Sequence, residues 1–289
     1  MEEKNRIKSI IEQVSKGVIQ AGTTFSSKKV QLYEEYMSNE KNDLSKWVIR
    51  NILDNEKVAR NTQFNLCDDT GIPHLILEMG EKAVLTTEYL EAIQEGLATG
   101  LRRLPGRPMA VKGNEVERVE QSKGLFEDPA MMVSAPIMIV KSKIKQLRLH
   151  ILLQGGGPEI RSKTYRVFHK HSYNNVIDEI IKWAKEEVSN LGCTPCIPCI
   201  GIGRSHYEAT AMMLLSMIEG KFDIQSDTET RITEEINRLN VGPLGLGGNT
   251  TAIATFLKTG PQRASGVRIV SLRLSCNVEP RLSSIDIKV

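Results

Sequence analysis

The sequence has few of the features that assign a protein to a specialised class. Its 289 residues carry a formal net charge of only +3, and no dense basic run is interleaved with aromatic side chains. This pattern gives no support to a nucleic-acid binder. The longest apolar runs, residues 131–140 and 209–218, have about half the length that a membrane-spanning helix needs. We find no linker, internal repeat or low-complexity segment, so we expect an ordinary globular protein.

Cysteine is also scarce, and its placement is uneven. The five cysteines are an odd number, and three of them lie within residues 193–199. A secreted disulfide framework would show an even number at regular spacing, so we expect a cytoplasmic protein with reduced thiols. The N-terminus leads directly into an amphipathic pattern, which predicts no signal peptide.

Hydrophobic periodicity predicts an α+β fold. Apolar residues recur at intervals of three and four in the first hundred residues, which indicates amphipathic helices around residues 7–18, 48–53 and 90–101. Further helices are expected over residues 174–190, 205–218 and 230–240. The β-rich runs 131–140 and 146–153 predict a hairpin, and later strands are expected over residues 250–257, 266–274 and 284–289. We therefore expect one compact domain over residues 1–289, with a helical N-terminal part followed by a mixed or antiparallel sheet and flanking helices.

The chain is organised around residues 191–204, which read LGCTPCIPCIGIGR. Cys193, Cys196 and Cys199 stand three apart, and the prolines between them disfavour a helix, so we expect an ordered loop between two helices. Thiolates bind zinc and iron–sulfur clusters, which makes metal binding the first hypothesis. Zinc would need a fourth ligand, for which His206 is a candidate, and the alternative is a set of packed, inert thiols.

Two more segments combine turn-forming residues with reactive groups. The run CDDTG at residues 67–71 is a turn by composition. A nucleophilic Cys67 assisted by Asp69 and His74 is one hypothesis, but carboxylates beside a thiol oppose thiolate formation. The triad Gly155–Gly157 follows a predicted strand, and adjacent glycines are typical of backbone that approaches a ligand closely, with a flexible loop as the alternative.

Five motifs occur in a fixed order along nearly the whole chain: CDDTG at 67–71, GGG at 155–157, Cys196-Ile-Pro, GPLGLGGNT at 242–250, and Cys276. This order resembles the α-subunit of the class I, iron–sulfur fumarate hydratase and L(+)-tartrate dehydratase family. The resemblance implies that Cys67, Cys196 and Cys276 bind a [4Fe–4S] cluster, which leaves one iron open to substrate as a Lewis acid. Cys196 matches the family best within its loop, while the roles of Cys193 and Cys199 stay open.

The reaction that the resemblance implies is the reversible hydration of a C4-type dicarboxylate such as fumarate or tartrate. Asp69 would bond the iron-bound hydroxyl or transfer a proton, and Thr70 would shape the turn. The expected substrate-binding residues offer backbone N–H groups or side chains to a carboxylate. They are Asp68, Gly155, Gly156, Gly157 and Arg281, with one of Arg102, Arg103 or Arg107.

Two residues depart from the family pattern. Asp68 replaces a glutamine, and Arg263 replaces a histidine of a Thr-His-x-Ala-Ser context, so the identity of the hydroxy-dicarboxylate stays open. The family's smaller β-domain does not follow Val289, so we expect a separate β-subunit and an α-subunit dimer, with neither nucleic acid nor membrane as a partner. The alternative is a non-catalytic iron–sulfur or zinc-binding protein derived from this family.

Overall fold

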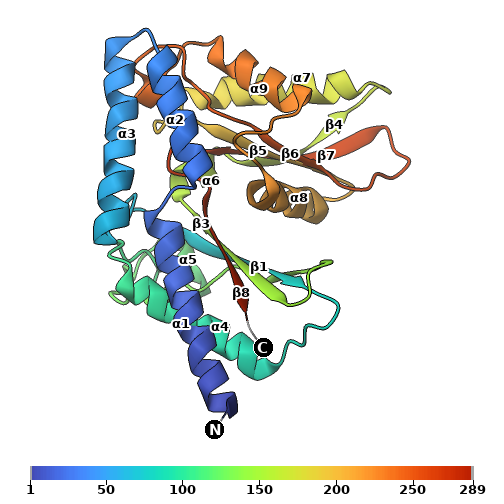
Figure 1. The fold of residues 1–289 in the computed structure, drawn as a ribbon. Coiled ribbons are helices and arrows are strands. Elements are labelled where there is room, and N and C mark those ends of the chain that lie inside the picture. Colours follow the sequence, from blue (N-terminus) through green and yellow to red (C-terminus); the bar gives the residue numbers. More distant parts are fainter. Residues whose placement is uncertain (1, 288–289) are drawn as a thin grey trace. The chain divides into compact units, whose positions relative to one another are not determined.

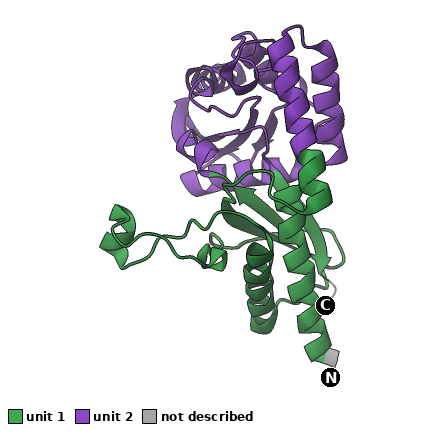
Figure 2. Ribbon diagram, turned by 90° about the vertical axis from the view of Figure 1, so that its left-hand side faces the viewer, with its two compact units in different colours: residues 1–24, 56–155, 281–289 green, residues 25–55, 156–280 purple. Residues whose placement is uncertain are grey.

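The computed structural model describes residues 2–287, which form an α+β fold as predicted. Within this fold, the contacts divide the chain into two compact units (Figure 2). Unit 1 consists of the chain up to residue 24, residues 56–155 and the chain from residue 281 onward. Unit 2 consists of residues 25–55 and 156–280. Each unit has its own sheet, and we describe the two units separately.

The sheet of unit 1 has the strand order β2-β1-β3-β8. Its helices and strands are α1 (Glu2–Thr23), α4 (Thr87–Arg103), α5 (Glu115–Glu120), β1 (Ile72–Met79), β2 (Met138–Lys141), β3 (Leu147–Gln154) and β8 (Arg281–Ile287). Helix α3 (Asp43–Thr62) ends in this unit, and the single turn η1 (Pro129–Met131) precedes β2. The apolar stripes predicted for α1 and α4 pack together against one face of the sheet.

The predicted hairpin of residues 131–140 and 146–153 is wrong. Strand β2 pairs in parallel with β1, and β3 pairs in antiparallel fashion with the other edge of β1. The apolar run Leu75–Leu77 is fully buried, so β1 gains most by taking the central place with a partner on each edge.

Unit 2 has a second sheet of order β4-β7-β5-β6. Its strands are β4 (Lys163–Phe168), β5 (Ile197–Gly203), β6 (Phe256–Thr259) and β7 (Val267–Ser275). Its helices and turns are α2 (Ser27–Asn39), the first part of α3, α6 (Gly156–Ile160), α7 (Tyr173–Val188), α8 (His206–Glu219), α9 (Asp227–Asn237) and η2 (Pro243–Gly245). Helix α8 covers one face of this sheet, and α7 covers the other (Figure 1).

The expectation of an ordered loop over residues 191–204 is only partly right. The chain is irregular up to Cys196, but residues 197–203 form β5, a central strand that is buried along its whole length. Ile197, Ile200 and Ile202 supply the apolar surface that favours this burial. Cys196 therefore lies at the point where the loop enters the sheet.

Strands β7 and β8 confirm the late strands, although Val289 lies outside the described residues. The predicted strand 250–257 is shorter, because regular pairing begins only at Phe256. Among the described residues, we find no helix that combines the length and the apolar character needed to cross a membrane.

Candidate metal and substrate site

In unit 1 the predicted site residues gather on the turn between α3 and β1. Thr70 is buried, Cys67 and Asp69 are half-buried, and Asp68 is exposed. The amide of Asn65 approaches the Thr70 hydroxyl at 3.4 Å, which fixes the side chain that the sequence analysis assigns to shaping this turn.

Of the three arginines considered for carboxylate binding, Arg107 lies against this turn. Its backbone N–H donates to the Asp68 carbonyl at 3.1 Å, and its guanidinium lies 3.8 Å from the Asp68 carboxylate. Arg102 and Arg103 instead form ion pairs with Asp128 and Glu12. The carboxylate that replaces the family's glutamine thus has a cation beside it.

Arg281 is the group around which the turn in unit 1 is built. It is the first residue of β8 and only 2% exposed. Its Nη1 donates to the Asp69 carbonyl at 2.7 Å, and its Nε donates to the Leu153 carbonyl at 3.2 Å. A buried guanidinium therefore ties the end of β3 to the backbone of the predicted catalytic aspartate.

Two glycines allow this close approach. Gly71 has φ +80°, and a Cβ there would lie 2.5 Å from the Gln154 carbonyl oxygen and 2.7 Å from Nη2 of Arg281. At Gly155 a Cβ would lie 3.1 Å from Oδ2 of Asp69. Only glycine provides both the positive φ and the space at position 71.

The thiol of Cys67 is influenced by the same groups, Asp69 and Arg281. Burial raises its pKa, while the Asp69 amide and the Arg281 guanidinium act to lower it, and the net effect is a raised pKa. A thiol with a raised pKa is a poor free nucleophile at neutral pH, which argues against a cysteine-nucleophile mechanism. His74 lies on β1 with its Nδ1 3.1 Å from the Ile72 carbonyl oxygen of the same strand.

In unit 2 the antiparallel pairing of Ile197 on β5 with Ser275 on β7 places Cys196 and Cys276 opposite each other at the strand ends. Cys196 is fully buried, and Cys276 is 8% exposed in the turn after β7. Burial raises the pKa of the Tyr33 hydroxyl, and the nearby Cys276 and Cys196 raise it further. Cys193, by contrast, is exposed, and Sγ of Cys199 lies 3.6 Å from the Ser275 hydroxyl.

The two cysteine segments of unit 2 are joined by the residue that follows Cys276. The backbone N–H of Asn277 donates to the Cys193 carbonyl at 2.9 Å, and its Nδ2 donates to the Thr194 carbonyl at 3.3 Å. Cys276 is thereby held against the segment that leads into Cys196. His206, considered as a zinc ligand, is exposed at the first position of α8.

These donors suit a sulfur-bound metal group. Burial strongly raises the pKa of the Cys196 thiol and raises that of Cys199 to about 12, so a thiolate at either position needs a compensating positive charge. A zinc ion or an iron–sulfur cluster supplies such a charge and prefers thiolate ligands. Within residues 2–287, no three His, Cys, Asp or Glu side chains are gathered in the geometry of a metal site.

Several buried charged residues near these cysteines were missed by the sequence analysis. Arg273 and Glu279 are both fully buried and form two hydrogen bonds of 3.0 and 3.1 Å, and Arg273 also pairs with Glu159. Arg273 interrupts an apolar run between Leu272 and Leu274, and this interruption is a signal that could have identified it.

Glu40 is a third residue that the sequence did not reveal. Its carboxylate, 3% exposed, accepts hydrogen bonds from the amides of Asn249 and Thr250 at 2.9 and 3.1 Å and from the Thr250 hydroxyl at 2.9 Å. It therefore organises the glycine-rich motif 242–250, in which Gly248 has φ +105°. The motif was recognised in the sequence, but its anchor lies in a distant turn between α2 and α3.

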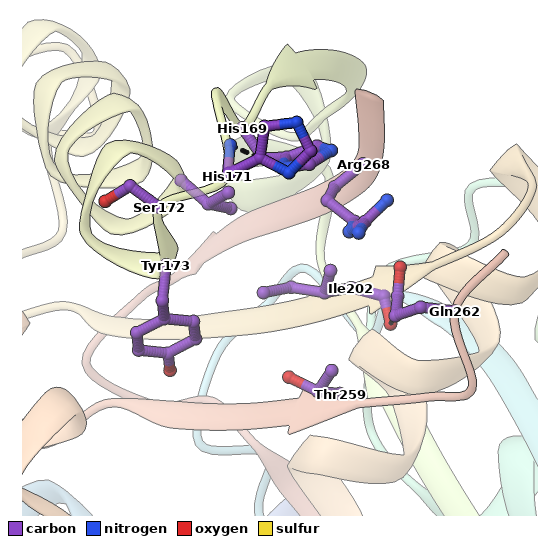
Figure 3. A pocket seen from close by; sticks show the side chains of 9 residues that line it. His169, His171, Ser172, Tyr173, Ile202, Thr259, Gln262 and Arg268 are labelled. Carbon is purple, nitrogen blue, oxygen red and sulfur yellow. Dashed lines mark hydrogen bonds between the residues drawn. The ribbon is translucent and has the colours of Figure 1, made fainter. Parts of the chain in front are cut away.

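A cavity of about 350 Å³ lies at the opposite end of β5 (Figure 3). His171, Tyr173, Gln262 and Arg268 surround it together with the buried Ile202. Ile202 is six residues along β5 from Cys196, which corresponds to about 20 Å. None of the predicted catalytic, substrate-binding or metal-binding residues lines this cavity.

Arg263 belongs to the same end of the sheet as the cavity. Its carbonyl oxygen accepts a hydrogen bond from Arg268 at 3.4 Å, and it lies between β6 and β7. The nine residues of β7 separate this segment from Cys276, a distance of about 30 Å along the strand. Within unit 2, Arg263 is therefore remote from Cys196 and Cys276.

Comparison with known proteins identifies relatives along nearly the whole chain. The family model described as "Fumarate hydratase (Fumerase)" matches residues 11–284. The protein "Putative L(+)-tartrate dehydratase subunit alpha" of Methanocaldococcus jannaschii is 27% identical over 239 residues, covering 78% of this chain and 79% of the relative. "L(+)-tartrate dehydratase subunit alpha" of Escherichia coli K12 is 20% identical over 280 residues, covering 93% and 89%.

Proposed function

The chain belongs to the fumarate hydratase (Fumerase) family of hydro-lyases, and on this premise we propose that it is the α-subunit of a [4Fe–4S] hydro-lyase. The proposed reaction is the reversible hydration of a C4-type dicarboxylate of the fumarate/malate or tartrate kind. The observation that carries the proposal is the family match over residues 11–284, which includes Cys67, Cys196 and Cys276.

We propose these three cysteines as the ligands of the cluster. The pairing of Ile197 with Ser275, which places Cys196 opposite Cys276, supports the choice of Cys196 over the exposed Cys193. A cluster held by Cys67, Cys196 and Cys276 would have one iron without a cysteine ligand, and that iron would supply Lewis-acid chemistry for the hydroxyl and carboxylate of the substrate.

The remaining proposed roles follow from the turn in unit 1. Asp69 exchanges a proton with the substrate, a role worth about 10²- to 10⁴-fold in rate, and Thr70 holds the shape of its turn. Arg281 fixes the Asp69 backbone and supplies positive charge for a substrate carboxylate. Asp68 and the amides of Gly155–Gly157 complete the proposed substrate contacts.

The names of the relatives bear on the partners. Both tartrate dehydratase relatives are named as α-subunits, which supports a β-subunit partner for this chain. We propose a heteromer built on an α-subunit dimer.

Anaerobic purification followed by iron, sulfide and zinc analysis tests the cofactor. We expect about four irons and four sulfides per chain. Cys67→Ser, Cys196→Ser and Cys276→Ser should each abolish cluster retention, whereas Cys193→Ser provides a matched control in the same loop and should retain it. Stoichiometric zinc without sulfide would instead identify the non-catalytic zinc-binding alternative.

Activity is tested after co-expression with a candidate β-subunit, on a panel that includes fumarate, malate and both tartrate enantiomers. We expect absorbance changes from formation or loss of a double bond with at least one of these substrates. A complex that retains the full cluster but turns over no hydroxy-dicarboxylate would contradict the proposed reaction while leaving the cofactor assignment intact.

A further inference from the structure

Helix α2 presents two polar side chains to the turn that follows Cys276. Lys29 is 1% exposed, and its Nζ donates to the Glu279 carbonyl at 2.7 Å. Tyr33, one helical turn further on and fully buried, donates its hydroxyl to the Asn277 carbonyl at 2.8 Å. Two successive turns of one helix face thus hold two carbonyls of the same short segment.

The network continues from this segment to the other cysteines of unit 2. Asn277 donates to the carbonyls of Cys193 and Thr194, as described above, and the Glu279 N–H donates to the Cys276 carbonyl at 3.0 Å. Tyr33 lies close enough to both Cys276 and Cys196 to interact with them electrostatically. The antiparallel pairing of Ile197 with Ser275 places Cys196 opposite Cys276, so the segment that Lys29 and Tyr33 hold begins beside both proposed ligands of unit 2.

A lysine is a costly choice for this buried position. Its ammonium lies 4.0 Å from the centre of the Phe25 ring, and transfer of an ammonium out of water is unfavourable unless it gains compensating interactions. The preceding Lys28 shows the ordinary arrangement, since it is exposed and pairs with Asp223 at 3.1 Å. Apolar packing alone would be served better by an uncharged residue than by Lys29.

We propose that Lys29 and Tyr33 are positioning residues that hold Cys276 beside Cys196. This inference rests on the proposed cluster, because both cysteines are proposed as its ligands. The two residues act through the backbone carbonyls of residues 277 and 279 and are not ligands themselves.

The chain offers matched control substitutions on the same helix. Lys29→Met and Tyr33→Phe remove the two donors with little change in side-chain volume. Lys28→Met and Tyr36→Phe make the same chemical changes at neighbouring positions, where the side chains face Asp223 and Asn237. All four variants should keep the helical circular dichroism of the wild type.

The first measurement is cluster retention in the reconstituted α-subunit, as the rate of iron transfer to a ferrous chelator under anaerobic conditions. Removal of groups that support metal ligands lowers metal affinity by roughly 10- to 100-fold, so we expect iron transfer to be faster by about that factor in Lys29→Met and Tyr33→Phe. The two control variants should match the wild type.

The second measurement needs no cluster. In the metal-free chain, alkylation of Cys276, followed by mass spectrometry of its peptide, should be several-fold faster in the two test variants than in the controls. A wild type that binds no iron would contradict the proposed function, and alkylation would still test the positioning role. If test and control variants agree in both measurements while the wild type holds four irons, the positioning role is wrong.

Discussion

The two units each bury an arginine, and the two arginines are satisfied in different ways. Arg273 in unit 2 is fully buried and meets the carboxylates of Glu279 and Glu159. Arg281 in unit 1 is 2% exposed and donates to the carbonyls of Leu153 and Asp69. Carboxylates neutralise a guanidinium, whereas backbone carbonyls satisfy its N–H groups and leave its charge in place.

From this difference we infer a structural role for the charge of Arg273 and a functional role for the charge of Arg281. The positive charge of Arg273 is balanced within its own unit, so its field falls off quickly. The charge of Arg281 acts on its surroundings, where it works to lower the pKa of the Cys67 thiol. The Arg281 charge thus partly offsets the burial that raises the pKa of this thiol, and it provides positive charge for a substrate carboxylate near the Asp69 turn.

The largest expected effect is the destabilisation caused by breaking the buried pair. Arg273→Met leaves the carboxylate of Glu279 buried without its cation, which should lower the free energy of unfolding by about 3–5 kcal/mol. The double variant Arg273→Met, Glu279→Gln removes both charges and should recover part of that loss. Urea unfolding of the α-subunit measures both, and a single variant that loses less than about 1 kcal/mol would contradict the pairing.

Arg281→Met should reduce stability less than Arg273→Met does, and it should reduce activity strongly. The loss of two hydrogen bonds should lower the free energy of unfolding by about 2–3 kcal/mol, while kcat/KM of the complex should fall by roughly 10²- to 10³-fold. Arg148→Met is the control, because Arg148 lies on the same sheet in an exposed ion pair with Asp286. Equal loss of activity in the two variants would show that Arg281 has no special role.

The sequence predicted those parts of the fold that depend on local patterns. The stripes of α1, α4 and α7 have helical periodicity, and β7 reads as a β-rich run. Strand pairing is not local, which is why β1 replaced the expected partner of β3. Residues 191–204 were misjudged because their prolines suggested a loop more strongly than their isoleucines suggested a buried strand.

In the candidate site, too, the sequence predicted the local features and not the contacts between distant residues. The composition of CDDTG predicts a turn. By contrast, nothing in the sequence near Arg281 indicates that its guanidinium donates to the Asp69 carbonyl. Lys29 follows Lys28 directly, and two adjacent lysines at a helix start read as a solvated surface. Only the packing of α2 distinguishes the buried lysine from the exposed one.

The glycine that accommodates Arg281 gives the next test of the comparison. Gly71 and Gly192 have nearly equal φ angles of +80° and +78°, but a Cβ at Gly192 would meet nothing within 4 Å. Gly192→Ala should cost about 1–2 kcal/mol, from backbone strain alone. Gly71→Ala adds contact with the Gln154 carbonyl and Arg281, so its cost should be about 1–3 kcal/mol larger. Thermal unfolding compares the two, and equal costs would mean that the turn relaxes away from Arg281.

Replacement of Glu40 should give the smallest loss of stability. Glu40 tests the comparison within one unit, because it is a buried charge that accepts hydrogen bonds from backbone groups in the same unit in which Arg273 is paired with carboxylates. Burial acts to raise its pKa, but hydrogen bonds from the amides of Asn42, Asn249 and others bring the pKa below its ordinary value of 4.5. Glu40→Gln should cost about 2 kcal/mol at pH 7.

A carboxyl with a depressed pKa in the folded state stabilises the protein above pH 4.5 and loses that contribution as the pH falls through the folded-state pKa. The stability difference between the wild type and Glu40→Gln should therefore be constant from pH 7 down to about pH 5 and shrink below pH 4.5. Arg281→Met should show no such decline, since a guanidinium stays charged throughout this range. If the Glu40→Gln difference persisted unchanged well below pH 4, the glycine-rich motif would depend on the shape of the Glu40 side chain and not on its charge.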